Sequence, residues 1–136
     1  MRVTVSRKSY FNAAHRLYRK DWSDEQNDLV FGKCNNPNYH GHNYDVIASV
    51  TGEIDKETGF VIDLKILKQL LKEEVEDAFD HKNLNLDVPE FKTLNPTAEH
   101  IVVVIYNRIK ARLEPHLDLE ITLYETPRNF VTYSGQ

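Results

Sequence analysis

The chain has 136 residues, enough for one domain (residues 1–136) with a single hydrophobic core. Apolar residues make up 40% of it and charged residues 28%, a balance that is typical of globular rather than disordered proteins. No apolar run approaches the roughly 18 residues of a membrane-spanning helix. The net charge of -4 argues against a general role in nucleic-acid binding.

The single cysteine excludes a disulfide within the chain. The first residues, "MRVTVSRKSYF", lack the apolar segment of a secretion signal. We therefore expect a cytoplasmic protein whose partners include neither nucleic acid nor a membrane.

Two long strands are predicted in the first part of the chain. The first covers Arg2 to Ala14, and a polar segment, "YRKDWSDEQNDLVFGKCNNPN", follows it. That segment is too long for a hairpin turn, and loops of such length are usually functional. The second strand covers His42 to Thr51, where residues alternate between one apolar face and one polar face.

Two amphipathic helices are predicted in the middle of the chain. The first begins after the cap Asp63, ends near Phe79 and has its apolar residues at helical spacing: Leu64, Leu67, Leu71, Val75 and Ala78. The second begins around "NPTAEH", where Asn95 is the expected cap and Pro96 suits the first turn. Its apolar stripe is formed by Ile101, Ile105, Ile109 and Leu113.

Two further strands are predicted at the end of the chain. One alternates with Leu117, Leu119, Ile121 and Leu123 on one face, and "FVTYS" follows the turn "TPRN" as the last strand. The order β-β-α-α-β-β predicts an α+β fold: a four-stranded antiparallel sheet with two helices on one face. Such a sheet has two open edges, which favour association of the chain into a homo-oligomer.

Three histidines are candidate metal ligands. His40 and His42 share one face if the strand begins at His40, and His15 lies at the end of the strand that would pair with it. Three histidines with an open fourth position are typical of catalytic zinc sites. A His-x-His pattern alone is weak evidence for a metal site, because packed or surface histidines produce the same pattern. Cys34 alone would fit an inert buried thiol.

Glu125 is the one carboxylate that the alternation places on an apolar face, in line with Leu123. A carboxylate there is costly unless a partner satisfies it. The alternative is that the strand has ended and that Glu125 faces water. Asp80 and His81 by themselves fit a solvated pair after a helix, and Glu99 fits the first turn of one.

Seven segments in order resemble the 6-pyruvoyl tetrahydropterin synthase family. They are "FNAAHRL", "SDEQN", "FGKCNNPNYHGHNY", "GEIDKETGFVIDLKILK", "DHKNLN", "PTAEHI" and "YETPRN". The cysteine followed by His-Gly-His is specific, and the whole series, which covers nearly the entire chain, is much more so.

The resemblance implies a zinc-dependent lyase. Cys34 matches the catalytic cysteine of the family, and Asp80 and His81 match the pair that completes its proton-transfer machinery. The zinc ligands of the family match three residues of this chain: His15, His40 and His42.

The resemblance also implies a pterin pocket. Glu125 matches the acid that anchors the pterin ring, and Thr97 and Glu99 lie in the helix-start motif that contacts the pterin. Tyr39 departs from the family, which commonly has glycine before the first histidine of His-Gly-His, and this side chain could alter the pocket rim.

The family fold implied is the tunnelling fold. In it, three subunits close their sheets into a barrel, two trimers stack into a hexamer, and the active sites lie between subunits. Open sheet edges in this chain, inferred independently, agree with that arrangement.

The family substrate is the small molecule 7,8-dihydroneopterin triphosphate, from which triphosphate is eliminated. One branch makes 6-pyruvoyltetrahydropterin, and the other makes 6-carboxytetrahydropterin and acetaldehyde on the route to queuosine. The spacer "NNPNY" between Cys34 and His40 favours the pyruvoyl branch, whereas "PTAE" keeps the carboxy branch open. Arg16 and Lys33 are weak candidates for the triphosphate site.

Two other classes of function remain more distant alternatives. A non-catalytic pterin- or purine-binding oligomer would keep Glu125 without needing Cys34. A metal-dependent hydrolase is disfavoured because the chain has no His-Glu-x-x-His motif, and a thiol beside three histidines suits proton abstraction better.

Overall fold

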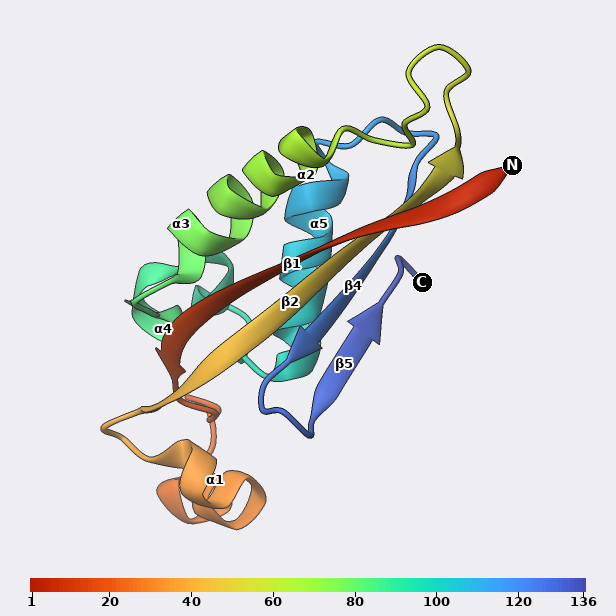
Figure 1. The fold of residues 1–136 in the computed structure, drawn as a ribbon. Coiled ribbons are helices and arrows are strands. Elements are labelled where there is room, and N and C mark those ends of the chain that lie inside the picture. The colour runs from red at the N-terminus through yellow and green to blue at the C-terminus, as the bar shows by residue number, and fades with distance from the viewer.

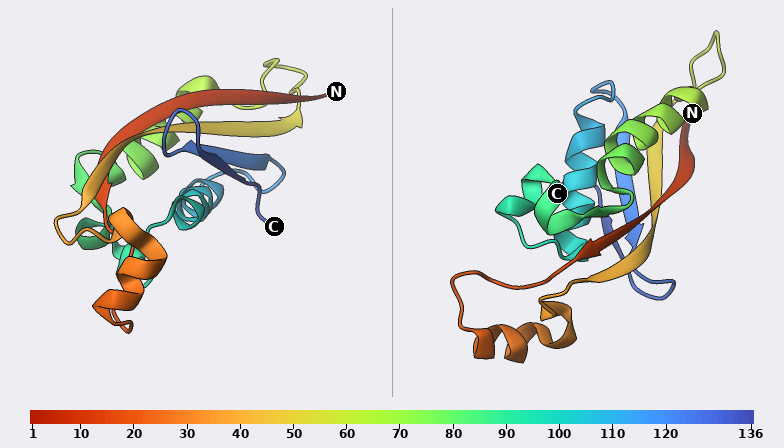
Figure 2. Two further views of the ribbon diagram at one scale, coloured as in Figure 1. Left: turned by 90° about the horizontal axis from the view of Figure 1, so that it is seen from below. Right: turned by 90° about the vertical axis from the view of Figure 1, so that its left-hand side faces the viewer.

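The computed structural model describes residues 1–136 as a curved sheet with its main helices packed on one face (Figures 1 and 2). The sheet has the strand order β3-β1-β2-β4-β5. The strands are β1 (Arg2–His15), β2 (His40–Glu53), β3 (Lys82–Asn83), β4 (Asp118–Tyr124) and β5 (Phe130–Tyr133). No helix is long and apolar enough to cross a membrane.

The predicted order β-β-α-α-β-β is confirmed for the main elements, but the predicted four-stranded antiparallel sheet is wrong. A fifth strand, β3, runs parallel to β1 and makes the sheet mixed. Only Lys82 and Asn83 belong to it, a run too short to leave a periodic pattern in the sequence. It pairs with Ala13 and Ala14, and so satisfies part of the open edge of β1.

The helices are α1 (Asp24–Phe31), α2 (Leu64–Leu71), α3 (Asp77–Phe79), α4 (Leu84–Asp87) and α5 (Ala98–Lys110). The π-helical turn Lys72–Glu76 joins α2 to α3, so the predicted helix that ends near Phe79 is one continuous helical segment. Two 3₁₀ turns, Gly32–Asn35 and Pro89–Lys92, complete the helical elements. The sequence pattern did not predict α1, α4 or these turns.

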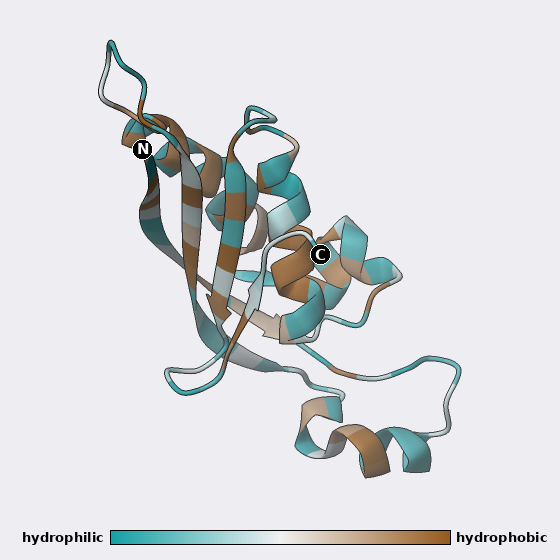
Figure 3. Ribbon diagram, turned by 90° about the vertical axis from the view of Figure 1, so that its right-hand side faces the viewer, coloured by the Kyte–Doolittle hydropathy of each residue, from teal (hydrophilic) through white to brown (hydrophobic).

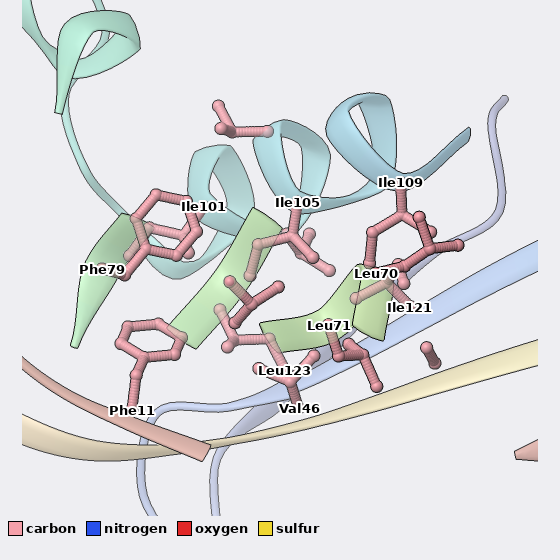
Figure 4. Packing of buried hydrophobic residues seen from close by; sticks show 14 of the residues in the cluster. Phe11, Val46, Leu70, Leu71, Phe79, Ile101, Ile105, Ile109, Ile121 and Leu123 are labelled. Atoms are coloured by element: carbon pink, nitrogen blue, oxygen red, sulfur yellow. The ribbon is translucent and has the colours of Figure 1, made fainter. Parts of the chain in front are cut away.

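The hydrophobic core lies between the sheet and the helices (Figure 4). Alternation along β2 and β4 buries one face of each strand, which Figure 3 shows as brown bands between teal ones. The predicted stripe of α5 and its continuation is fully buried at Ile101, Ile105, Ile109 and Leu113. Leu64 was predicted to lie on the apolar stripe of the first helix, but it is 50% exposed at the start of α2. Leu70 is buried instead.

The predicted cap of the second helix is also corrected. Thr97, not Asn95, caps α5, and its hydroxyl accepts a hydrogen bond from the backbone N–H of His100 at 3.2 Å. Asn95 instead accepts a side-chain hydrogen bond from the backbone N–H of Tyr18 at 3.2 Å. Pro96 therefore precedes the helix rather than opening it, which leaves its carbonyl group available for another partner.

The ends of β1 and β2 that carry the candidate residues lie at one end of the sheet. Residues 16–39, which connect these strands, form α1 and project beyond the sheet and away from the core (Figures 1 and 2). The two strands pair over their whole length, from Arg2 opposite Glu53 to His15 opposite His40. The fold thus brings the two halves of the candidate site together by backbone pairing alone.

Candidate active site

Three histidines gather where β1 ends and β2 begins. His15 pairs directly with His40, and Ala13 with His42, so the three imidazoles share the core face of the sheet. The centroid of the His15 ring lies 4.5 Å from that of His40 and 5.1 Å from that of His42. One ring nitrogen from each histidine lies within 4.8 Å of the others.

The three nitrogens are buried and unpaired, which is costly unless a ligand satisfies them. His15 Nε2, His40 Nδ1 and His42 Nε2 have no hydrogen-bond partner. Imidazole nitrogens in a set of three are the donors that a catalytic zinc ion takes in proteins. The residues present therefore fit a divalent metal ion, and the predicted histidine cluster is confirmed.

His15 is held in the orientation that a metal ligand needs. Its Nδ1 lies 2.8 Å from the carbonyl oxygen of Pro96, so the Nδ1–H group donates and the free electron pair is left on Nε2. The hydroxyl of Tyr44 lies 3.4 Å from the same Nδ1. The segment before α5 thus orients a ligand that belongs to β1.

Burial keeps His15 and His40 neutral. It lowers the pKa of His15 to about 4, although the hydrogen bond to Pro96 acts in the opposite direction. Burial and the neighbouring His42 also lower the pKa of His40, while Glu125 raises it. Neutral imidazole is the form that binds metal, so both shifts favour coordination at neutral pH.

Cys34 lies beside the histidines. The half-buried thiol belongs to the 3₁₀ turn after α1. It lines an open pocket of about 660 Å³ together with His40 and His42. Lys33 and Asp28 line the same pocket. The structure thus places the only thiol on one pocket with two of the three histidines, in line with the sequence prediction.

Asp80 and His81 form a pair at the outer edge of β1, and neither lines the pocket of Cys34. His81 Nδ1 lies 2.9 Å from Asp80 Oδ2, and the His81 side chain is 83% exposed. The backbone of Asn12 holds the pair, because its N–H donates to Asp80 Oδ1 at 2.8 Å and its carbonyl accepts from the N–H of His81 at 2.6 Å.

The hydrogen bonds of Asp80 keep it ionised. Its pKa is lowered first by the N–H of Asn12 and then by His81. The backbone of His81 has a positive φ of 60°, which turns its side chain out of the regular strand direction. The structure therefore presents this pair on the open edge of the sheet, apart from the histidine cluster of the same chain.

Glu125 lies one residue beyond the end of β4, two residues after the inward-facing Leu123. The ladder between β2 and β4 ends just before it, with Tyr124 opposite Asp45. Its backbone N–H donates to the carbonyl of Asn129 at 3.0 Å, which holds it at the start of the hairpin turn. Burial and, after it, the charge of Glu125 raise the pKa of Tyr44, and the same charge opposes the lowering of the His40 pKa, as expected of a carboxylate near the cluster.

The other predicted residues are placed less centrally. Thr97 is half-buried as the cap of α5, and Glu99 is exposed in the first turn of that helix. Arg16 directs its Nε to Asn35, so it supports a residue of the pocket wall rather than lining the pocket itself. Lys33 is exposed at the pocket and remains available to an anionic ligand.

Sequence reasoning missed three contributors to the site: Tyr44, the carbonyl of Pro96, and Asn35. Tyr44 shares the period-two face of His42, so strand alternation alone could have placed it beside the cluster. A backbone carbonyl leaves no signal in the sequence. Asn35 follows Cys34 directly and was read only as a turn-forming residue.

Comparison with known proteins identifies the family. A family model described as 6-pyruvoyl tetrahydropterin synthase matches residues 4–136. The chain is 46% identical over 132 residues to the human 6-pyruvoyl tetrahydrobiopterin synthase, an alignment that covers 97% of this chain and 91% of the relative. This chain therefore belongs to the 6-pyruvoyl tetrahydropterin synthase family.

A solved structure and a more distant relative complete the comparison. The structure of the 6-pyruvoyl tetrahydropterin synthase from Caenorhabditis elegans matches with a TM-score of 0.94 and 40% identity, over 100% of this chain and 97% of the other. A 6-carboxy-5,6,7,8-tetrahydropterin synthase from Rickettsia conorii is 27% identical over 147 residues, covering 95% of this chain and 98% of the relative.

Proposed function

We propose that the chain is a zinc-dependent lyase that acts on 7,8-dihydroneopterin triphosphate and eliminates triphosphate to give 6-pyruvoyltetrahydropterin. The observation that carries this proposal is the cluster of three unpaired imidazole nitrogens, two of whose rings line one pocket with the only thiol of the chain. We infer that the reaction takes place in the cytoplasm, as the single cysteine and the composition suggest.

The zinc ligands in this proposal are His15, His40 and His42. Zn²⁺ held by these three imidazoles would supply Lewis-acid chemistry that acidifies neighbouring hydroxyl and C–H groups. The tautomer of His15, fixed by the Pro96 carbonyl, supports this assignment because it leaves Nε2 free.

Cys34 is the proposed general base. Elimination of triphosphate requires removal of a proton from the carbon side chain of the pterin, and a thiolate near cationic groups is a competent base. The half-buried position of Cys34 in the same pocket as His40 and His42 supports this role. Lys33, in the same pocket, is the candidate for contact with the triphosphate.

Asp80 and His81 are the proposed proton relay. The Nδ1–H of His81 donates to the Asp80 carboxylate, which leaves His81 Nε2 free to exchange a proton with substrate or solvent. Because the pair projects from the outer edge of β1, we infer that it serves the active site of a neighbouring subunit. Its high exposure in the isolated chain supports this inference.

Glu125 is the proposed anchor of the pterin ring. The ring presents an exocyclic amine and a neighbouring N–H group, and a carboxylate accepts both hydrogen bonds in bidentate fashion. The position of Glu125 just beyond the end of β4, two residues after the inward-facing Leu123, supports this role. Thr97 and Glu99, at the start of α5, are proposed as further pterin contacts.

The proposed assembly is a hexamer made of two stacked trimers. The outer edge of β1 is paired only at Ala13 and Ala14, and β5 has no neighbour on its outer side. Pairing of β5 in one subunit with β1 in the next would close three sheets into a barrel and satisfy both edges. The unpaired edges support this tunnelling-fold assembly.

The pyruvoyl product is favoured over the carboxy product by two observations. Cys34 and His40 are separated by the five residues "NNPNY", and identity is 46% to the human pyruvoyl enzyme but 27% to the carboxy enzyme. Mass spectrometry of the product distinguishes the two, because the carboxy product has lost two carbons as acetaldehyde.

The decisive experiment is turnover of 7,8-dihydroneopterin triphosphate by zinc-loaded protein. We expect triphosphate release and a pyruvoyl product from the wild type, and Cys34→Ala should lose turnover by a factor of about 10² to 10⁴ while it still binds the pterin. Absence of triphosphate release from protein with measured zinc content would reject the proposal. Equal ligand binding with no turnover in both proteins would instead favour a pterin-binding oligomer.

A further inference from the structure

Asn35 is a buried amide directly after the thiol residue. Asn35 is only 4% exposed, yet both polar groups of its side chain and its backbone oxygen are hydrogen-bonded. Arg16 Nε donates to both the backbone oxygen and the Oδ1 of Asn35, each at 3.0 Å. Asn35 Nδ2 in turn donates to Asp28 Oδ1 at 2.7 Å.

The two partners of Asn35 come from different segments of the chain. Arg16 directly follows the metal-ligand candidate His15, whereas Asp28 belongs to α1 and lines the pocket of Cys34. The backbone N–H of Leu17 also donates to the carbonyl of Cys34 at 2.9 Å. The turn that carries the thiol is therefore tied on one side to the end of β1 and on the other side to α1.

Arg16 is itself fixed, so it offers Asn35 a rigid partner. Its backbone N–H donates to Asn85 Oδ1 at 2.8 Å, and Asn85 Nδ2 donates back to the Arg16 carbonyl at 2.9 Å. Its guanidinium group lies 3.9 Å from the centroid of the Tyr18 ring. Asn85 belongs to α4, which follows the Asp80–His81 segment, so the same network reaches the segment that carries the proposed relay.

We propose that Asn35 is the positioning residue that sets the thiol of Cys34 against the histidine cluster, through its bonds to Arg16 and Asp28. This inference rests on the proposed function, in which Cys34 is the base. A base acts only within hydrogen-bond reach of its proton, and a displacement of about 1 Å costs on the order of 100-fold in rate. Asn35 acts on the thiol through the backbone of the turn and does not touch the substrate.

The hydrogen bond between Asn35 and Asp28 has a defined donor and acceptor, and exchanging the two gives a direct test. Asn35→Asp places two carboxylates face to face and removes the donor, so the turn should shift. Asp28→Asn alone keeps an acceptor oxygen for Asn35 Nδ2, so it measures the effect of the lost Asp28 charge by itself. The double variant N35D/D28N restores one donor and one acceptor in reversed order, and it keeps the net charge of the wild type.

Asn27 provides the matched control for general loss of stability. It is 3% exposed in the same helix as Asp28, and its amide donates to the backbone oxygens of Arg19 at 2.9 Å and Ser23 at 3.2 Å. None of these groups belongs to the turn of Cys34. Asn27→Ala should therefore lower the melting temperature and leave kcat unchanged.

The measurements are kcat and KM with 7,8-dihydroneopterin triphosphate, and the alkylation rate of the single cysteine by iodoacetamide at fixed pH. In Asn35→Asp we expect kcat to fall on the order of 10- to 100-fold with a smaller change in KM. The half-buried thiol should be alkylated severalfold faster. Both values should return toward those of the wild type in N35D/D28N.

Two results would overturn the proposal: a double variant as impaired as Asn35→Asp, or an Asn35→Asp variant with the kcat and alkylation rate of the wild type. An Asn27→Ala variant with the same loss of kcat would also overturn it, because the effect would then be one of stability. If the wild type fails to turn over the substrate, the proposed function fails, and the alkylation rates still decide whether Asn35 positions the thiol.

Discussion

His15 Nδ1 and the carbonyl oxygen of Pro96 lie 2.8 Å apart, which joins the end of β1 to the segment that begins α5. This hydrogen bond fixes the tautomer of a residue that is fully buried. It also explains why Pro96 precedes the helix, since its carbonyl would otherwise be used within the first turn. The metal-binding geometry is thus built into the packing of sheet and helix before any ion binds.

Removal of the metal should destabilise the protein, because three buried imidazole nitrogens lose their partner. A ligand that binds only the folded state at 1,000 times its dissociation constant contributes about 4 kcal/mol. We therefore expect a chelator to lower the melting temperature and added Zn²⁺ to restore it. Differential scanning calorimetry measures both changes.

A ligand variant is the control for that measurement. His40→Ala removes one imidazole from the cluster, so its melting temperature should respond little to chelator or to zinc. A zinc-dependent rise of equal size in His40→Ala and in the wild type would mean that zinc stabilises the protein from another site.

The metal-free protein should lose stability as the pH falls through the range of histidine titration. The pKa of His15 is lowered from 6.5 in the unfolded chain to about 4 in the folded one, so the unfolded state binds the proton first. The contribution is fully present above pH 6.5 and is lost progressively toward pH 4. By pH 5 it amounts to a loss of about 2 kcal/mol.

Urea unfolding of wild type and His15→Gln between pH 7 and pH 5, both with chelator, isolates this contribution. Every other titratable group is present in both proteins, so the difference between the two curves is assigned to His15. Parallel curves would show that His15 is protonated equally in the folded and unfolded states.

Period-two alternation made the three histidines candidates for one site, and the family resemblance then singled them out as metal ligands. His15, His40 and His42 follow from two strands paired in register, because alternate side chains share a face. The same rule predicted an inward position for Glu125, which the structure places one residue beyond the end of β4. Alternation could not predict which residue caps α5. Asn95 and Thr97 are both good capping residues, and the packing of the preceding segment against His15 selects Thr97.

Features made by few residues or by the backbone escaped prediction. β3 has two residues, too few for a pattern, and exists because β1 offers an unpaired edge. The helix α1 was hidden because its polar residues resemble a loop, and its exposed Leu29 and Val30 form no buried stripe. The separation of Asp80 and His81 from Cys34 depends on tertiary placement that no local pattern encodes.

Replacement of Tyr39 by glycine should stabilise the protein. Its φ is 66°, a left-handed conformation that costs a residue with a side chain about 1–2 kcal/mol. Glycine adopts this conformation freely but loses more entropy on folding, so Tyr39→Gly should raise the free energy of unfolding by about 0.5–1 kcal/mol, measured with urea.

Gly59, with a φ of 78° and open space around it, is the control, because Gly59→Ala should lower the free energy of unfolding by about 1 kcal/mol. Destabilisation by Tyr39→Gly would mean that the tyrosine ring makes a compensating contact.

Substitution of Glu125 should weaken pterin binding more than it slows the chemical step. Glu125→Gln removes two charge-assisted hydrogen bonds to the ring, and bonds of this kind contribute about 1.5–3 kcal/mol. We expect KM to rise about 10- to 100-fold with a smaller change in kcat. Glu120→Gln, an exposed residue on the other face of β4, should leave both constants unchanged. A fall in kcat alone for Glu125→Gln would assign the carboxylate to catalysis instead of anchoring.

Mixed oligomers should reveal whether the Asp80–His81 pair serves a neighbouring subunit. Cys34→Ala and His81→Ala should each be inactive, but in co-expressed oligomers about a quarter of the sites would combine an intact thiol with an intact histidine from the next subunit. Cys34→Ala mixed with His40→Ala is the control, because both changes fall on one pocket and no intact site can form. Equal activity in the two mixtures would contradict a shared site. Activity recovered only in the mixture of Cys34→Ala and His81→Ala would place His81 across a subunit boundary, as its exposure at the edge of β1 predicts.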